Sequence, residues 1–444
     1  MATDIERPLP VRLNTAFWYW LKLGFISFGG PAGQIALMHT ELVERRRWIS
    51  ERRFLHALNF CMVLPGPEAT QLAVYIGWLM HKTRGGIMAG VLFVLPSLLI
   101  LIVLSWIYLA FGQLPLVAGI LYGIKPAVVA IVLAAAWRIG LRSLKNAWLI
   151  AIAAAAFLAI AIFHLPFPLI MLSAAAIGVV GARVRPDQFH VGGQRPDANV
   201  TFGPALIDDA TPTPQHALFF WKHLCRVTVL GCALGLTIWL LLAARFGLGH
   251  PLVQMGWFFT KAALLTFGGA YAVLPYVYQG GVEHFHWLNA AQMIDGLALG
   301  ETTPGPLIMI VAFVGFVGAA GHALFGSHLL LAGAAGASIA TFFTFLPSFI
   351  FILAGGPLVE SMRDNIQMIA PLTAVSAAVV GVIVSLALFF GEHVFWLDTA
   401  RPHWDYTAMA ICVAACGALF KFKAGTIKLI FACAAAGLVL SYRY

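Results

Sequence analysis

Long apolar stretches, separated by short polar loops, run along almost the whole chain. Residues 87–110 and 116–137 are two of these stretches, and each is long enough as a helix to cross the roughly 30 Å hydrocarbon core of a bilayer. The pattern predicts an all-α polytopic integral membrane protein.

The chain also contains an internal repeat. Nine residues between positions 22 and 67 recur 239 positions later (261 − 22 = 239) without a gap, and Leu95-Pro96-Ser97 recurs as Leu346-Pro347-Ser348. Nine identities at one offset indicate duplication of one module. The repeated residues are Lys22, Phe28, Gly29, Gly30, Glu44, Trp48, Pro65, Gly66 and Pro67, matched by Lys261, Phe267, Gly268, Gly269, Glu283, Trp287, Pro304, Gly305 and Pro306.

A polar stretch at residues 182–217 separates the two copies. It carries five prolines and no apolar periodicity, which is typical of an extended linker. The apolar segment at 224–244 lies outside both copies and can serve as a single crossing that reverses the second one. The sequence therefore predicts a first repeat at 1–181, a linker with an inverting transmembrane helix at 182–250, and a second repeat at 251–444.

The loops between the two glycine-containing motifs differ in charge. The loop at 44–53 carries five arginines, whereas the equivalent loop at 283–287 contains histidines and no Lys or Arg. Because Lys and Arg concentrate in cytoplasmic loops, the first loop should face the cytoplasm and the second should not. This difference predicts inverted repeats, a common plan of secondary transporters that bind substrate near the bilayer midplane.

Basic clusters flank residues 13–41 and 54–81 on both sides, and all of them favour the cytoplasm. Each run is broken once, at Phe-Gly-Gly or at Pro-Gly-Pro, so each can enter the bilayer, turn at the break and leave on the same side. Re-entrant hairpins are the preferred interpretation, and full-length helices kinked at these points are the alternative. With the second copy this gives 13 apolar segments, about 9 full spans plus 4 hairpins.

Composition excludes several classes of protein. The chain is 61% hydrophobic and only 10% charged, and its net charge of +9 sits in short loops, which indicates membrane topology rather than nucleic-acid binding. The sequence has no CxxC pair, phosphate-binding Gly-x-x-x-x-Gly-Lys loop or HExxH motif. We therefore expect no metal, no cofactor and no enzymatic activity. The polar N-terminal residues do not resemble a removable signal peptide.

The two motifs break helices, because Gly removes the side chain and Pro removes N–H donors. Four broken ends near the midplane would present free N–H groups to an anion. A duplicated module with Phe-Gly-Gly and then Pro-Gly-Pro resembles the two-domain chromate ion transporter (CHR) family over roughly 14–137 and 253–390. The resemblance implies chromate efflux across a bacterial inner membrane, chromate resistance, and sulfate as a related dianion. It assigns substrate binding to the motif residues Phe28, Gly29, Gly30, Pro65, Gly66, Pro67, Phe267, Gly268, Gly269, Pro304, Gly305 and Pro306.

A dianion at bilayer depth requires positive charge and hydrogen-bond donors. Lys22 and Lys261 each precede a Phe-Gly-Gly break by about two helical turns, and Ser27 and Thr266 add a hydroxyl beside each break. Lys125, inside a long span, is a further candidate for substrate binding or for pairing with a counter-ion. The alternative for Lys22 and Lys261 is that they extend to the bilayer interface, the usual behaviour of membrane lysines.

Carboxylates near the breaks are candidates for proton coupling. Glu68 directly follows the first Pro-Gly-Pro, Glu301 precedes the second by three residues, and Asp295 lies two turns earlier. Ionisable groups at this depth are costly and tend to be functional or paired. Coupling and a salt bridge to a nearby lysine are equal alternatives for both glutamates, and the salt bridge is favoured for Asp295.

The sequence thus predicts a secondary active transporter, of the antiporter type, that exports chromate in exchange for protons. A sulfate or other oxyanion carrier and a passive anion channel are the alternatives. The expected partners are chromate or sulfate, protons and the lipid bilayer, without nucleic acid. The number of subunits is left open, with a homodimer as one form.

Overall fold

The computed structural model describes residues 8–185, 188, 202–209, 211–212, 214–267, 269–322, 328–361, 369–397 and 403–441. Within them the chain is almost wholly helical, and its one sheet is a ribbon of two-residue strands. Residues 186–187, 189–201, 210 and 213 of the predicted linker and the motif residue Gly268 lie outside the described residues.

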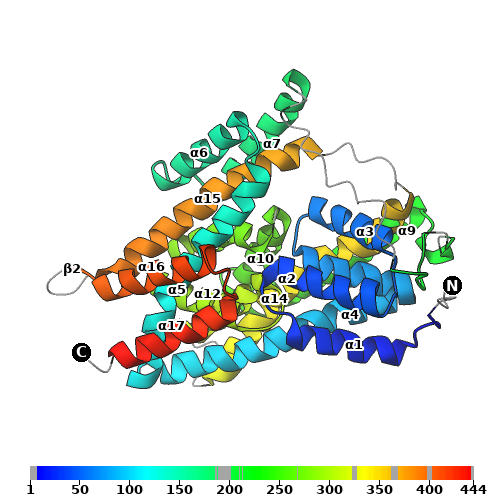
Figure 1. Cartoon of the computed structure of the whole chain (residues 1–444). Helices are drawn as coiled ribbons and strands as arrows, with labels where there is room; N and C mark the ends of the chain where they lie inside the picture. The colour runs from blue at the N-terminus through cyan, green and yellow to red at the C-terminus, as the bar shows by residue number, and fades with distance from the viewer. Residues whose placement is uncertain are drawn as a thin grey trace, which may run out of the picture.

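The elements follow one another along the chain as Figure 1 shows. In order they are α1 (Leu13–Ile26), α2 (Gly30–His39), η1 (Thr40–Arg45), α3 (Glu51–Val63), α4 (Glu68–Phe111), α5 (Pro115–Ser143), α6 (Ala147–Ala161), α7 (Phe167–Val184), η2 (Gln215–Ala217), α9 (Trp221–Phe246), α10 (Pro251–Leu265), η3 (Ala270–Val273), α11 (Leu274–Tyr278), η4 (Gln279–His284), α12 (Ala290–Thr302), η5 (Leu307–Met309), α13 (Ile310–Gly321), α14 (Leu329–Ser361), α15 (Ile369–Phe395), β1 (Trp396–Leu397), β2 (His403–Trp404), α16 (Tyr406–Phe420) and α17 (Thr426–Ser441).

The prediction of an all-α polytopic membrane protein is confirmed in its coarse form. Among the described residues, six helices are long and apolar enough to cross a bilayer, and several shorter apolar helices accompany them. Many large apolar side chains are exposed on the outside of the molecule, as expected of a surface that meets lipid rather than water. The number of spans and the hairpins stay predictions. The six candidate spans are Glu68–Phe111, Pro115–Ser143, Phe167–Val184, Trp221–Phe246, Leu329–Leu358 and Pro371–Phe395.

Helix α4 consists of two helical segments, which we name its first and second legs, and the two fold back on each other. Its backbone leaves the helical conformation at His81 and Lys82. The legs approach closely through glycines, because a Cβ on Gly77 would lie 2.5 Å from the carbonyl oxygen of Gly85. In the second copy, α13 and α14 meet in the same way, and a Cβ on Gly315 would lie 2.5 Å from the carbonyl oxygen of Gly336.

The chain reverses direction at each Phe-Gly-Gly break. In the first copy, the ring of Tyr19 in α1 contacts the ring of Trp48, which follows α2, with their centroids 5.0 Å apart. The equivalent rings of the second copy, Phe258 and Trp287, lie 5.4 Å apart. A chain that continued straight through the break would carry Trp48 far from Tyr19, so α1 and α2 must run back toward the same end of the molecule (Figure 1).

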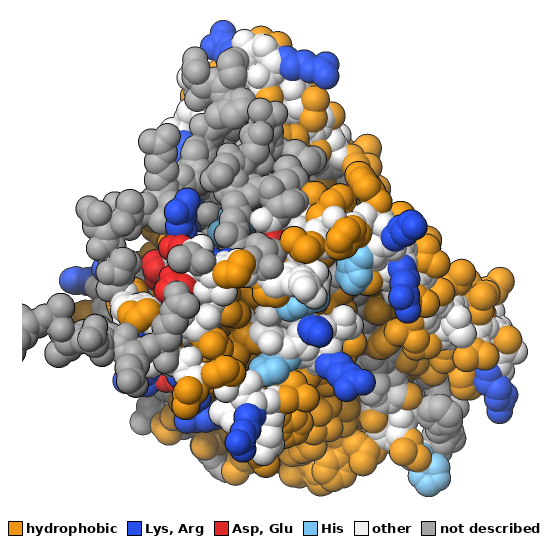
Figure 2. All heavy atoms as spheres, turned by 90° about the vertical axis from the view of Figure 1, so that its right-hand side faces the viewer, with side chains coloured by type: hydrophobic (Ala, Val, Ile, Leu, Met, Phe, Trp, Pro, Cys, Tyr) orange, Lys and Arg blue, Asp and Glu red, His pale blue; other side chains and the backbone are white. Residues whose placement is uncertain are grey.

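The second leg of α4 separates two ends of the molecule. At one end, which we name the linker end, His81 bonds to the carbonyl oxygen of Val11, and Leu206 of the linker donates its N–H to Arg47. The second-copy loop with Trp287 lies beside Leu109 instead, close to the last residue of α4. The loops of the two copies therefore lie at opposite ends of the second leg of α4, which runs from the break at Lys82 to Phe111. Figure 2 views the linker end, where Lys and Arg side chains are spread over the face.

Candidate functional site

The breaks of the two copies meet in the interior of the molecule through a reciprocal pair of backbone hydrogen bonds. Gly66 of the first Pro-Gly-Pro donates its N–H to the carbonyl oxygen of Thr266 at 2.8 Å, and Gly305 of the second donates to Ser27 at 2.7 Å. Each residue of one bond is the repeat equivalent of its counterpart in the other, since 305 − 66 and 266 − 27 both equal 239. We name this region the crossing; its described residues are 27–30, 65–67, 266–267, 269 and 304–306.

The central glycines of both Pro-Gly-Pro motifs are required by conformation and by space. Gly66 has a φ of 121° and Gly305 a φ of 105°, in the region that side chains strain to adopt. A Cβ on Gly66 would lie 2.4 Å from Oγ of Ser348, and one on Gly305 would lie 2.7 Å from Cβ of Ser97. The Leu-Pro-Ser motifs therefore complete the crossing. The repetition of those motifs was visible in the sequence, yet Ser97 and Ser348 were not among the predicted site residues.

The polar groups around the two glycines are not equivalent. Ser27 and Ser97 are fully buried beside Gly305, and neither Oγ has a hydrogen-bond partner among the described residues. On the other half, the Thr266 hydroxyl donates to Ala262 at 2.7 Å, and Ser348 Oγ accepts from Gln71 at 3.4 Å. Because a buried polar atom without a partner is costly, the two free serine hydroxyls indicate a place that a polar ligand can occupy.

Two glutamines support the crossing and have no polar counterpart in the other copy. The side-chain amide of Gln34 donates to the carbonyl oxygen of Gly305, and that of Gln71 donates to Pro65 at 2.7 Å. Their repeat equivalents are Val273 and Ile310. Sequence reasoning missed both glutamines, because a search for repeated residues cannot find groups that only one copy carries.

Helix N-termini point into the same region. Helix α2 begins at Gly30 with the N-cap Gly29 at a φ of 88°, and α4 begins at Glu68 directly after Pro67. The first N–H groups of such helices lack partners inside the helix and attract anions. The aromatic members Phe28 and Phe267 are both half-buried beside the breaks. The motif residues thus lie together around the crossing, and their role in substrate binding stays a prediction.

The predicted lysines lie away from this cluster. Lys22 is exposed on α1, on the same face as the exposed Trp18 and Phe25. Lys261 is exposed on α10, with Nζ 5.5 Å from the ring centroid of Trp257. Both side chains therefore occupy outward, apolar faces in this structure. Their role in substrate binding also stays a prediction.

The two glutamates proposed for coupling lie close to the breaks in different surroundings. Glu301 is buried in α12 and accepts a hydrogen bond from the hydroxyl of Tyr271, which follows the second Phe-Gly-Gly. Glu68 is half-buried, and no hydrogen bond or ion pair involves it among the described residues. Two arginines near the end of α5 act on them electrostatically, Arg142 on Glu68 and Arg138 on Glu301. Neither arginine was among the site residues predicted from the sequence.

Lys125 lies between the crossing and the end of the molecule opposite the linker. Its Nζ is 3.4 Å from Oδ2 of Asp295, which also accepts a hydrogen bond of 3.0 Å from Tyr108. Asp295 is 3% exposed, and its second carboxylate oxygen, Oδ1, has no partner among the described residues. The structure thus brings Lys125 to Asp295 and not to the motif residues.

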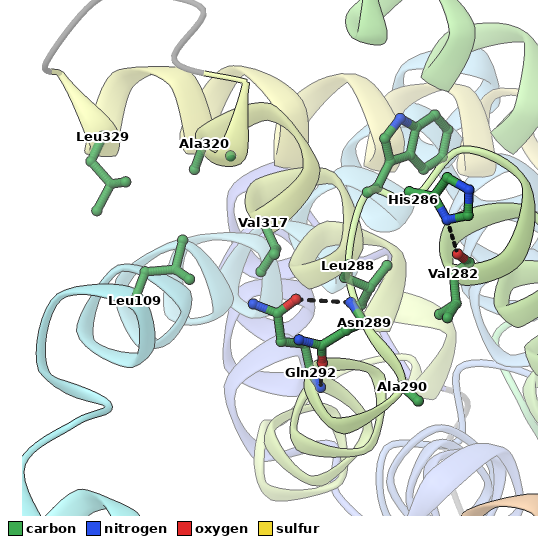
Figure 3. Close-up of a pocket in the computed structure, with 12 residues that line it drawn as sticks. Leu109, Val282, His286, Leu288, Asn289, Ala290, Gln292, Val317, Ala320 and Leu329 are labelled. Carbon is green, nitrogen blue, oxygen red and sulfur yellow. Dashed lines mark hydrogen bonds between the residues drawn. The ribbon is translucent and has the colours of Figure 1, made fainter.

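A cavity of about 620 Å³ opens at the same end (Figure 3). Figure 3 shows Gln292 and Asn289 at its edge, joined by the reciprocal hydrogen bonds that cap α12. Leu109, the neighbour of Tyr108, lies across from them. Gln292 at the cavity is one helical turn from Asp295, although the Lys125–Asp295 pair itself does not line the cavity.

The chain's relatives were found by comparison with known proteins. The family profile described as Chromate transporter matches residues 14–179 and 253–438, more of the chain than the motifs alone suggested. A chromate transport protein of Pseudomonas aeruginosa is 32% identical over 438 residues, which are 98% of this chain and 94% of that protein. One of Cupriavidus metallidurans is 29% identical over 424 residues, 95% and 92% of the two chains. A probable chromate transport protein of Synechococcus elongatus is 29% identical over 375 residues, 84% and 83%.

No solved structure matches the chain. The profile and the three relatives cover both copies of the module, and they are transport proteins rather than enzymes. The chain therefore belongs to the chromate transporter family.

Proposed function

We propose that this protein is a secondary active transporter that exports chromate and accepts sulfate as a related tetrahedral dianion. The observation that carries the proposal is the pair of buried serine hydroxyls beside Gly305, Ser27 and Ser97, for which the described part of the chain offers no hydrogen-bond partner. Hydroxyls and backbone N–H groups can donate to several oxygens of a tetrahedral oxyanion at once. The chromate transport proteins among the relatives suggest which oxyanion it is.

Two arginines supply positive charge for a dianion on the side of the crossing that faces the linker end. The guanidinium groups of Arg138 and Arg142 are exposed, and their charges act at longer range on Glu301 and Glu68; a dianion bound beside these glutamates would be attracted in the same way. Helix N-termini add partial positive charge without a mobile side chain. The free-energy cost of moving an unpaired dianion into the bilayer is prohibitive. Positive charge and hydrogen-bond donors near the midplane reduce that cost.

Inverted repeats with four re-entrant hairpins account for the geometry best. The equivalent loops at Trp48 and Trp287 lie at opposite ends of the second leg of α4, and each chain reversal at Phe-Gly-Gly returns to the end from which it came. The arginine-rich first loop makes the linker end cytoplasmic by the distribution of Lys and Arg. The cavity at the opposite end then faces the periplasmic side of a bacterial inner membrane.

A carrier explains the packing better than a passive channel. Helix α12 packs against α4, α5, α15 and α17 toward the end opposite the linker, whereas its equivalent α3 packs closely against α4 alone among the described helices. Leu297 in α12 is fully buried, and Leu58 at the equivalent position of α3 is half-buried. Helix α12 is therefore closely packed and α3 loosely packed, and we interpret this difference as one closed and one open half around the crossing, as alternating access requires.

Proton coupling is assigned to Glu68 and Glu301. Both lie within one turn of a Pro-Gly-Pro break, where a dianion bound at the crossing would act on their charge. Changing both to glutamine keeps the shape and hydrogen bonding but removes titration. The double variant should bind chromate and lose the response of its transport to an imposed pH gradient. A double variant that still accelerates with the gradient as the parent does would remove these residues from the coupling step.

The experiment that tests the proposed function is flux of radiolabelled chromate in everted membrane vesicles, with sulfate as the competitor. The proton gradient is imposed in one arm and collapsed with an uncoupler in the other. We expect saturable uptake that sulfate inhibits and that collapse of the gradient slows. Linear, uncoupler-insensitive flux would favour a channel, and flux of sulfate without chromate would favour the sulfate carrier.

A further inference from the structure

We propose that Lys125, Asp295 and Tyr108 form a gate at the end opposite the linker, in which an outgoing oxyanion replaces the Asp295 carboxylate at Lys125. The inference rests on the proposed function and adds a second binding position on the path. It differs from the coupling step, because it uses a carboxylate that is already paired with a lysine. Glu68 and Glu301 have no lysine against them among the described residues.

The three residues join three helices where the molecule is closed. Asp295 belongs to α12, Lys125 to α5 and Tyr108 to the last turn of α4. The 3.4 Å ion pair and the 3.0 Å hydrogen bond therefore hold α12 against both neighbours. The sequence of the other copy carries His56 at the position of Asp295 and Ser376 at that of Lys125, and there α3 is the loosely packed helix. The ion pair therefore lies in the half of the molecule whose helix, α12, is closely packed.

Asp295 is suited to leave Lys125 when an anion arrives. Its Oδ1 is buried and has no hydrogen-bond partner in the part of the chain that the structure describes, while the Lys125 side chain remains 29% exposed. Helix α12 packs against α4, α5, α13, α15 and α17, and the groups of these elements that act on Asp295 are Lys125 and Tyr108 among the described residues. An anion at Lys125 would be the dominant new charge, and it would favour the protonated form of Asp295.

The exchange balances with one proton. The paired state holds Lys125 as ammonium and Asp295 as carboxylate. Binding of the dianion at Lys125 releases Asp295, which takes up a proton from the solution that enters the cavity beside Gln292. When the dianion leaves, the proton returns to the same solution and the ion pair re-forms. The step therefore opens and closes one end of the path and moves no net proton across the membrane.

Proton uptake by purified protein tests this gate. The protein is mixed with chromate in weakly buffered solution at matched pH, and protons taken up per anion bound are measured with an indicator dye. Asp295→Asn should bind chromate at least as tightly as the parent and take up about one proton fewer per anion. Lys125→Met should also lose that proton, because Asp295 without its cation is already protonated, but should bind about tenfold or more weakly.

A matched control comes from Asp405, a buried carboxylate that accepts from the hydroxyl of Tyr122 at 2.8 Å. Asp405→Asn replaces a similarly placed, tyrosine-bonded carboxylate by an amide that does not titrate, and it should leave proton uptake at the parental value. With sulfate, whose charge is constant near neutral pH, the parent's affinity should fall with rising pH by up to about tenfold per unit, and the Asp295→Asn affinity should change less.

The outcomes separate the gate from the proposed function. Chromate binding with unchanged proton uptake in Asp295→Asn would overturn the gate and leave the transporter proposal standing. Absence of chromate and sulfate binding by the parent would overturn the proposed function and the gate together. If Asp295→Asn gives no folded protein, Lys125→Met carries the same test, and parental proton uptake in that variant overturns the gate.

Discussion

Helices α3 and α12 hold equivalent positions in the two copies but lie in different surroundings. Both lead into a Pro-Gly-Pro break, and both carry a leucine at the equivalent positions 58 and 297. Leu297 is fully buried in a core that both halves form, whereas Leu58 is half-buried beside a smaller core made mostly by the first copy. The two equivalent helices therefore differ in packing within one structure: α12 is closely packed and α3 is loosely packed. If the two halves can exchange these arrangements, access to the crossing passes from one end to the other.

The same two halves differ in polar chemistry. Around Gly305 the hydroxyls of Ser27 and Ser97 have no hydrogen-bond partner within the described ranges, while around Gly66 the equivalent Thr266 and Ser348 have partners. The two copies therefore have equivalent backbone hydrogen bonds at the crossing but different side-chain hydrogen-bond donors. A substrate that binds off the pseudo-symmetry axis, on the Gly305 half, is the simplest consequence.

The largest effect is expected from Gly305→Ala, which should abolish transport and reduce the amount of folded protein. The new Cβ would be strained at a φ of 105°, by about 1–3 kcal/mol, and would also collide with Ser97. Gly247→Ala is the matched control, since Gly247 has a φ of 86° with no atom within 4 Å of the added Cβ. Thermal unfolding and flux are measured for both. Equal behaviour of the two variants would mean that the crossing tolerates a side chain and does not position the site.

The next effect compares Ser97→Ala with Ser348→Ala. Ser97 should lose a hydrogen bond to a charged ligand, worth about 1.5–3 kcal/mol, so chromate affinity should fall by about 10- to 100-fold. Ser348→Ala removes only an acceptor for Gln71, so affinity should change less. Equilibrium chromate binding measures both. A larger loss for Ser348→Ala would place the anion on the Gly66 half instead.

The smallest effect is expected from Lys22→Met and Lys261→Met. Because both side chains are exposed on outward faces in this structure, chromate affinity should stay within about fivefold of the parent. Binding and membrane yield are measured together, to separate loss of affinity from loss of protein. A fall comparable to that of Ser97→Ala in both variants would return the lysines to the binding site, in an arrangement of α1 and α10 other than this one.

The sequence predicted the class of fold and the family because those features are repeated along the chain. Phe-Gly-Gly, Pro-Gly-Pro and Leu-Pro-Ser occur in both copies, and duplication makes such positions visible in one sequence. The motifs of one copy bond to those of the other, through Gly66 to Thr266 and Gly305 to Ser27. Sequence alone does not show this pairing, because the bonded residues are about 200 or more positions apart and the bonds involve only backbone atoms.

Residues that occur in only one copy could not be found by comparing the two copies. Gln34 supports Gly305 from α2, and Arg138 and Arg142 act on the glutamates from the end of α5, yet none has an equivalent that would single it out. Asp295 was expected to pair with a lysine, but the partner, Lys125, lies 170 positions away (295 − 125 = 170). Only packing of α12 against α5 brings the two together.

The central claim is that the two halves exchange a closed and an open arrangement around a bound oxyanion. Cysteines at Leu58 and Leu297 report it most directly, because they replace the same residue type at equivalent positions. The background chain has its exposed Cys225 and Cys232 replaced by serine, so that these two do not react. Reaction with a hydrophilic thiol reagent is followed in everted vesicles, with and without saturating chromate. We predict that Leu58→Cys reacts many times faster than Leu297→Cys without chromate, and that chromate slows the first and speeds the second. Equal rates at the two positions, or changes in the same direction when chromate is added, would contradict the account.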